Sequence, residues 1–290
     1  MVSEGEAFCP GHVTAFFEVH EDSNPRKKGS RGAGLCLSLG VRTVARVRED
    51  AHPSIDVIVN GRRQKAEVTE RVAEKILGGR SCEVKILSET NLPVSQGFGV
   101  SAAAALSTAL ALDDALGTKM PRDELVAVAH ETEVECGTGL GDVVPASMGG
   151  MDLRLKPGAP AHAEVRTFRV KADLLLAVVG AEMPTKTVLR DPTKVAAINR
   201  IGGELVDEFS RDPTLERLFE LGARFAEGTG LADKRVLEVI RASRMFGRAM
   251  MAMLGNSVVA TGNREQLATL YLKFGTLQRC GVDNEGARVL

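Results

Sequence analysis

The sequence predicts a chain of mixed helices and strands that falls into two halves. Apolar patterns indicate strands in the first half at residues 35–47, 55–59 and 82–87. Asn60-Gly61 is a strong signal for a hairpin turn. The alanine- and leucine-rich run 102–116 favours a helix, because both residue types have high helix propensity. The first half therefore combines both kinds of element.

Two further helices are expected in this half. Residues 67–77 have helical spacing and reach Gly78-Gly79, which suits a helix end. Pro121 fits the first position of a helix that runs to about residue 135, because proline has no N–H to lose there.

The second half has a different texture. A buried strand is expected at 173–179, a short one at 258–260 and another in the tail, with helices at 193–209, 215–227, 234–253 and 264–273. The stretch 156–163 (KPGAPAHA) is either a hairpin loop or a linker. We place a domain boundary just after it, which gives domains 1–168 and 169–290.

Composition argues against several classes of protein. The 290 residues include 37 Lys and Arg against 38 Asp and Glu, so no large basic surface for nucleic acid is expected. The five cysteines form no C-x-x-C pair, which argues against a zinc or redox motif. No apolar run approaches the ~20 residues of a membrane helix, and the N-terminus has no apolar signal core. We therefore expect a cytoplasmic protein that binds neither nucleic acid nor membrane.

The segment 93–103 (PVSQGFGVSAA) carries the clearest chemical signal. Gly97 and Gly99 let the backbone turn tightly and approach a ligand. The helix that begins near Ala102 would point its free N–H groups at that ligand, and phosphate is the natural occupant. Ser101 stands where its hydroxyl can cap the helix or meet Mg²⁺.

Two other interpretations of this segment exist. It is a strand–turn–helix corner with no ligand, or it is a relaxed dinucleotide fingerprint. The fingerprint requires an acid at the end of the next strand, whereas Asp113 and Asp114 lie inside the alanine- and leucine-rich helix. The sequence has no Walker A loop and no protein kinase signature.

A second cluster of acids lies at residues 131–142. Glu131 and Glu135 share a helix face, where like charges repel unless a cation lies between them. Glu133 and Glu135 fit a solvated acidic face equally well. Asp142 follows three alternating glycines, which expose its carboxylate, although it also fits a turn.

Together, these segments resemble the GHMP kinases, the family of galactokinase, homoserine kinase and mevalonate kinase. The central motif of that family reads roughly P-x-x-x-G-L-G-S-S-A-A, and here Phe98 replaces Leu and Val100 replaces the first Ser. In the family, a metal-binding Glu precedes an acid by eleven residues, as Glu131 precedes Asp142.

Two other family motifs are altered here. Residues 8–12 (FCPGH) resemble A-P-G-K with His12 in place of Lys, and residues 253–257 (MLGNS) keep only one glycine of the third motif. Within the family, the chain most resembles the pantoate kinases of archaea. That likeness runs through FCPGHVTAFF, GSRGAGLCLSLG, PVSQGFGVSAAAALSTALAL, ECGTGLGDV and residues 184–190 (PTKTVLR).

The resemblance implies a two-domain α+β fold. A ribosomal-S5-like N-terminal domain with a left-handed βαβ crossover binds ATP, and a ferredoxin-like C-terminal domain completes the substrate cleft. The implied reaction converts ATP and pantoate into ADP and 4-phosphopantoate, a step towards coenzyme A. ATP and Mg²⁺ are the implied cofactors, and related kinases often form dimers, so a homodimer is allowed.

Site residues follow from the same resemblance. Asp142 is the implied catalytic residue, and Ser101 with Glu131 would hold Mg²⁺. Pantoate carries a carboxylate, so a cation should face it, and the candidates are Arg31, His12 and Lys186. The implied ATP phosphate site consists of Pro93, Gly97, Phe98, Gly99, Val100, Ser101, Ala102 and Ala103.

Alternatives remain open at this point. The acceptor could be another small hydroxy acid or alcohol, such as mevalonate or homoserine. The chain could also be a nucleotide-binding sensor that has lost catalysis, but the retained Ser101, Glu131 and Asp142 argue against this.

Overall fold

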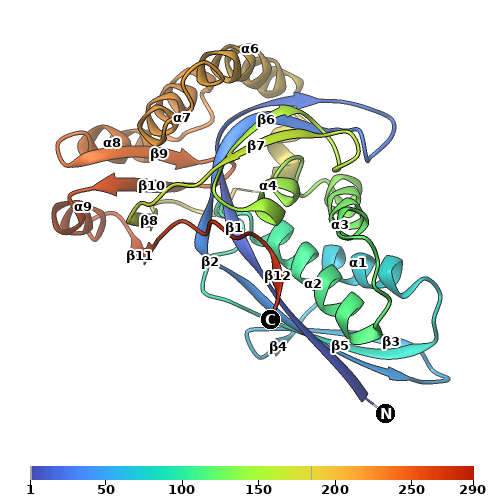
Figure 1. Cartoon of the computed structure of the whole chain (residues 1–290). Coiled ribbons are helices and arrows are strands. Elements are labelled where there is room, and N and C mark those ends of the chain that lie inside the picture. The colour runs from blue at the N-terminus through green and yellow to red at the C-terminus, as the bar shows by residue number, and fades with distance from the viewer. Residues whose placement is uncertain (1, 184) are drawn as a thin grey trace.

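A long antiparallel hairpin organises the structure (Figure 1). The computed structural model describes residues 2–183 and 185–290, and the hairpin joins β1 (Val2–His20) to β2 (Gly29–Glu49). Around it forms an eight-stranded sheet in the order β12-β1-β2-β5-β3-β4, in which β6 pairs with β2 and β7. The remaining strands of this sheet are β3 (Ser54–Val59), β4 (Arg62–Arg63), β5 (Cys82–Thr90), β6 (Met151–Lys156), β7 (Glu164–Phe168) and β12 (Arg288–Val289).

The helices of the first half lie against this sheet. The alanine-rich α2 (Val100–Leu116) packs on β1 and β2, and α1 (Glu67–Leu77) and α3 (Arg122–Cys136) pack beside it. The short α4 (Val143–Met148) follows the second glycine loop. The expected strands, helices and hairpin turn of this half are confirmed, and the stretch 156–163 is a hairpin loop between β6 and β7.

A second, four-stranded sheet has the order β11-β8-β10-β9. Its strands are β8 (Leu174–Val178), β9 (Gly247–Ala252), β10 (Ser257–Gly262) and β11 (Thr276–Cys280). The helices that accompany it are α5 (Thr185–Leu189), α6 (Pro192–Phe209), α7 (Leu215–Thr229), α8 (Lys234–Ser243) and α9 (Arg264–Tyr271). Of these, α7 and α8 contact β9, and α6 contacts β1 of the first sheet.

The predicted helix at 234–253 is wrong in its second part. The helix α8 ends at Ser243, and residues 247–252 form β9 instead. Alanine and methionine favour a helix locally, but this run is paired along its whole length with β10 and its last four residues are buried. Tertiary pairing therefore overrides local propensity. The sequence patterns also failed to indicate β1, β6 and β7.

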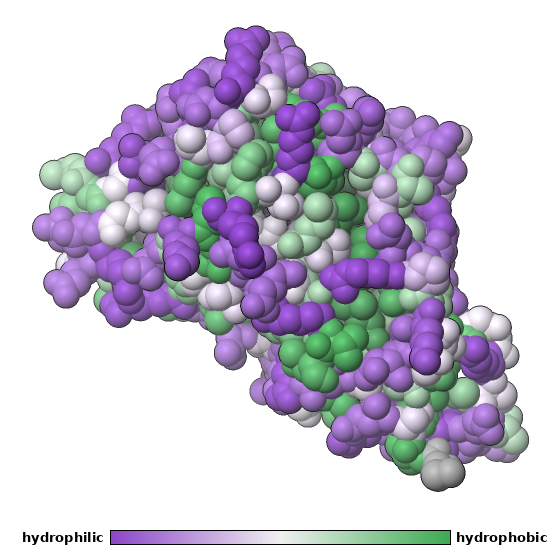
Figure 2. All heavy atoms as spheres, in the orientation of Figure 1, coloured by the Kyte–Doolittle hydropathy of each residue, from purple (hydrophilic) through white to green (hydrophobic). Residues whose placement is uncertain are grey.

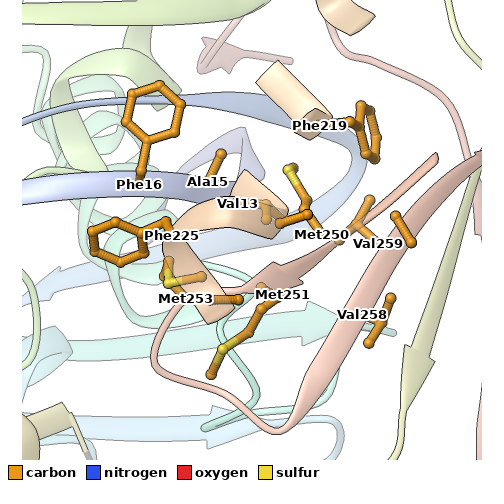
Figure 3. Packing of buried hydrophobic residues seen from close by; sticks show 14 of the residues in the cluster. Val13, Ala15, Phe16, Phe219, Phe225, Met250, Met251, Met253, Val258 and Val259 are labelled. Atoms are coloured by element: carbon orange, nitrogen blue, oxygen red, sulfur yellow. The ribbon is translucent and has the colours of Figure 1, made fainter. Parts of the chain in front are cut away.

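Two hydrophobic cores meet along the β1–β2 hairpin. Ala7 and Cys9 of β1 pack in the core under α1 to α4, whereas Val13 and Ala15 to Phe17 pack in the core under the second sheet. Figure 3 shows Val13, Ala15 and Phe16 close to Met250 and the other apolar side chains of that second core. The register of the hairpin shifts between Pro10 and His12, where β1 passes from one core to the other.

The chain end returns to the first sheet, because β12 pairs with β1. The division between residues 168 and 169 therefore stays a prediction, as does the hand of the crossover from β3 through α1 to the parallel β5. Across the described residues, the helices fall short of the length and hydropathy that a membrane span requires. In the view of Figure 2, hydrophilic residues cover most of the outline and hydrophobic ones gather towards the middle.

Candidate active site

A cavity of about 310 Å³ lies where the two glycine loops meet α5 and the β9–β10 turn. It brings together Ser101, Asp142 and Lys186, which were predicted as site residues from distant parts of the sequence. The predicted phosphate loop contributes Gly97, Phe98, Gly99, Val100, Ser101 and Ala102 to its wall, whereas Pro93 and Ala103 are not among the lining residues. The expected juxtaposition of loop and acid is therefore present.

The glycines of the first loop are required by close packing as well as by their backbone angles. Gly97 has φ 79° and Gly99 has φ 64°, a region that favours glycine. A Cβ on Gly97 would lie 2.6 Å from the carbonyl oxygen of Ala252, and one on Gly99 would lie 2.8 Å from the backbone N and O of His12. The loop is thus held between β1 and the β9–β10 turn.

Ser101 does not cap the helix α2. The N-cap residue is Gly99, which has no side chain, so the first N–H groups of α2 remain available to a ligand. The Ser101 hydroxyl instead donates to Oε1 of Glu133 at 2.5 Å, and the hydroxyl of Thr138 donates to the same oxygen at 2.7 Å. All three side chains belong to residues of the cavity wall.

Glu133 is a buried carboxylate with no cationic partner among the described residues. Its exposure is 2%, and neither hydroxyl donor carries a charge. Burial raises its pKa to about 7, although the hydroxyls of Ser101 and Thr138 favour the ionised form. The interpretation of Glu133 as part of a solvated acidic face is therefore wrong.

Glu131 lies on the other side of α3. It accepts hydrogen bonds from Arg26 at 2.8 Å and from Lys75 at 3.0 Å. Burial alone would raise its pKa, but these two cations outweigh burial and hold the pKa below its usual range. Lys75 also lies 3.0 Å from Glu135, so it is the cation that offsets the expected repulsion. Glu131 is absent from the cavity wall and does not meet Ser101.

Asp142 is the second acid of the cavity wall. Its Oδ1 accepts from Nδ1 of His12 at 2.7 Å and from the hydroxyl of Thr14 at 3.2 Å. Burial by itself would raise the pKa of Asp142, but the hydrogen bond and charge of His12 outweigh it, and the pKa falls below its ordinary value. With 28% of its side chain exposed, Asp142 is an ionised carboxylate open to the cavity.

The three predicted substrate cations have different positions. The side chain of His12 is fully buried and faces Asp142, which removes it from direct contact with a substrate. Arg31 pairs with Glu18 at 3.0 Å and does not line the cavity. Lys186 lines the cavity and forms no ion pair within the described residues. Pro184, which belongs to the stretch 184–190, lies outside those residues.

Comparison with known proteins identifies relatives of this chain. The family described as GHMP kinases N terminal domain matches residues 65–150. A pantoate kinase of Thermococcus kodakarensis is 36% identical, with 90% of this chain and 88% of the relative covered. One of Methanocaldococcus jannaschii is 30% identical, with 90% and 93% covered.

The chain belongs to the GHMP kinase family.

The fold of this GHMP kinase agrees with that of a solved relative. A structure described as a phosphotransferase related to the CoA biosynthesis pathway superposes with a TM-score of 0.90 at 31% identity, and covers 100% of this chain and 99% of that one. The expected α+β fold is confirmed.

Several residues in and behind the cavity were missed from the sequence. Thr14, Glu133 and Thr138 line the cavity, and Asp152 and Arg154 lie behind Asp142. The helical phase was the available signal for Glu133, because residues two apart on a helix lie about 200° apart, so Glu131 and Glu133 cannot face the same site. No comparable pattern marks Asp152, which lies 140 positions from His12 in the chain.

We predict that Gly99→Ala disturbs the phosphate loop in addition to straining the backbone. The matched control is Gly117→Ala, because Gly117 has φ 61° but a methyl group on its Cα would meet no described atom within 4 Å. Both variants should lose about 1 kcal/mol of unfolding free energy to the left-handed conformation. Only Gly99→Ala should lose further stability and nucleotide affinity, measured by urea unfolding and calorimetric titration. Equal behaviour of the two variants would contradict the packing argument.

The raised pKa of Glu133 predicts a pH-dependent stability in EDTA. A carboxyl whose native pKa lies above its unfolded value of 4.5 contributes stability below pH 4.5 and loses it as pH rises through about 7. Between pH 5 and 8 the loss should be on the order of 3 kcal/mol. Glu133→Gln should flatten this dependence in urea titrations, whereas Glu131→Gln should leave it in place. A wild-type protein with constant stability over this range would disprove the assignment.

Proposed function

We propose that the chain transfers the γ-phosphoryl group of ATP to the 4-hydroxyl of pantoate, forming ADP and 4-phosphopantoate. The single observation that carries this proposal is the shared cavity of the helix α2 N-terminus and the ionised Asp142. The helix N-terminus suits phosphates, and the carboxylate of Asp142 suits a hydroxyl that must lose its proton. The two relatives named pantoate kinase support the choice of acceptor.

The phosphates of ATP are assigned to the loop from Gly97 to Ser101. Its backbone packs closely against β1 and the β9–β10 turn, and the open N–H groups of α2 provide positive partial charge. Phosphoryl transfer depends mainly on positioning and charge neutralisation, and this loop would contribute to both.

Ser101 and Glu133 carry oxygens that would hold a divalent cation in place of the hydrogen bond that now joins them. Glu133 is a buried carboxylate that lacks a positive partner among the described residues, and its neighbours supply hydroxyl oxygens. In the part of the chain that is described, no group of three or more His, Cys, Asp or Glu side chains is arranged to hold a metal ion by itself. Mg²⁺ needs few protein oxygens when phosphates and water supply the rest, and it would neutralise phosphate charge there. We therefore assign the metal role to Glu133 in place of Glu131.

Asp142 and Lys186 are assigned to the acceptor. Oδ1 of Asp142 is occupied by His12 and Thr14, whereas Oδ2 takes part in no hydrogen bond of the described residues. Oδ2 can therefore orient the 4-hydroxyl and accept its proton as the phosphoryl group arrives. The ammonium of Lys186 is the cavity cation best placed for an anionic group, the carboxylate of pantoate or a phosphate of ATP.

The acceptor is tested by an assay of ADP release with Mg·ATP against pantoate, pantothenate, mevalonate and homoserine, with product masses measured. We expect turnover with pantoate and addition of one phosphoryl group. Turnover with another acceptor alone would overturn the substrate assignment. Tight nucleotide binding without turnover on the whole panel would support a sensor instead.

Paired variants test the roles of the acids. Asp142→Asn should lower kcat by about 10² or more with little change in ATP affinity, because the proton acceptor is lost. Glu133→Gln should weaken activity and raise the Mg²⁺ requirement, whereas Glu131→Gln, an identical change two residues away, should leave both near normal. Steady-state kinetics at several Mg²⁺ concentrations distinguish the two glutamates, and a larger effect at Glu131 would return the metal role to that residue.

Two further expectations complete the proposal. We infer that the reaction takes place in the cytoplasm as a step of coenzyme A biosynthesis, in keeping with the description of the solved relative. A homodimer stays a prediction, which sedimentation would test.

A further inference from the structure

A closed ring of hydrogen-bonded side chains lies behind Asp142. Nε2 of His12 faces Oδ1 of Asp152 at 2.6 Å, while Nδ1 faces Asp142. Arg154 donates to the other oxygen of Asp152 at 2.9 Å and to Thr14 at 3.1 Å, and Thr14 donates to Asp142. His12, Asp152 and Arg154 are each at most 2% exposed. The ring therefore connects Asp142, which lines the cavity, to Asp152, which is buried and does not line it.

With Asp142 and Asp152 both ionised, this geometry requires a doubly protonated His12. A neutral imidazole has one N–H and one lone pair, so one of its nitrogens would oppose a carboxylate oxygen at 2.6 or 2.7 Å. An imidazolium donates from both nitrogens. The ring then holds two positive groups, His12 and Arg154, and two negative ones, Asp142 and Asp152. Mutual attraction and hydrogen bonds between balanced charges offset part of the cost of removing them from water.

The surroundings of His12 add no competing charge. The facing groups are Asp142 before α4, Asp152 and Arg154 on β6, and Cys36, which is its register partner on β2. Burial raises the pKa of the Cys36 thiol well above its ordinary value, with a further contribution from Asp152, so the thiol stays neutral. Burial alone would lower the pKa of His12, but the two carboxylates outweigh it and the pKa is raised.

We propose that Asp152 is a positioning residue that keeps His12 as an imidazolium, and that His12 in turn keeps Asp142 ionised and fixed in orientation. The part that concerns Asp142 rests on its proposed role as proton acceptor. The charge state of His12 does not depend on which substrate the enzyme uses.

The Asp152→Asn variant separates charge from geometry. The amide of Asn can donate to Nε2, so a neutral imidazole can keep its Nδ1–H bond to Asp142 while the positive charge is lost. The matched control is Asp207→Asn, since Asp207 pairs with Arg31 on the surface, away from the cavity.

The direct test is NMR of protein labelled with ¹⁵N-histidine, titrated from pH 5.5 to 8.5. We expect His12 to remain doubly protonated up to pH 8 in the wild type and in Asp207→Asn. In Asp152→Asn, as the pH rises, His12 should lose its second proton before pH 8 is reached. A neutral His12 in the wild type at pH 8 would overturn the proposal even if the variant failed to fold.

The pH dependence of kcat provides the functional test. In Asp152→Asn kcat should show an additional transition at the pH where His12 loses its second proton, because above that pH the positive charge beside Asp142 is gone, whereas the wild type should show no such transition up to pH 8. The KM for ATP should change little. A profile without this transition in a folded variant would show that Asp152 has only a structural role. Lack of kinase activity on every acceptor would refute the proposed function, while the NMR result for His12 would still stand.

Discussion

The β1–β2 hairpin belongs to both hydrophobic cores, and the site depends on that arrangement. Near the open end of the hairpin, residues such as Ala7 and Val41 pack under α2. Nearer the turn, residues such as Phe16 and Leu35 pack under the second sheet. The register shift near Gly11 occurs where the strand changes cores, and it places His12 at the junction. Gly99 lies against the backbone of His12, so the phosphate loop is positioned by the same strand that carries the partner of Asp142. The packing of the two cores on β1 therefore also sets the distance between the phosphate loop and His12, the partner of Asp142.

The two acids of the cavity face opposite environments, which favours different roles for them. Glu133 has only neutral hydroxyl donors, and its pKa rises, so it is a carboxylate that lacks a counter-charge. Asp142 is paired with the cationic His12, and its pKa falls, so it is a carboxylate already stabilised by the protein. Environments that separate the pKa values of two acids are how enzymes assign distinct functions to one residue type.

Local physics explains what the sequence could predict. The loop from Gly97 to Ser101 follows from glycine geometry and helix ends, and the helix 67–77 follows from periodicity and its terminal glycines, so both were found. The strand β9 was missed because its pairing with β10 is a tertiary effect that outweighs helix propensity. The sequence interpretation chose Glu131 as the metal ligand from linear spacing, whereas the proposed assignment to Glu133 rests on the phase of the helix. The ring behind Asp142 joins β1 to β6, and no local pattern encodes such a contact.

Counter-charge offers a general criterion for separating structural acids from functional ones in this chain. Glu131 is neutralised by Arg26 and Lys75, so the protein itself completes its interactions and a ligand would have to displace them. Glu133 is not neutralised in this way, so its burial is best explained by a cation that arrives with the nucleotide. The same criterion applies with opposite sign to Lys186, a cavity cation without an acidic partner among the described residues. A site that leaves one buried acid and one cation uncompensated fits the proposed ligands, because Mg·ATP and pantoate together supply a metal, phosphates and a carboxylate.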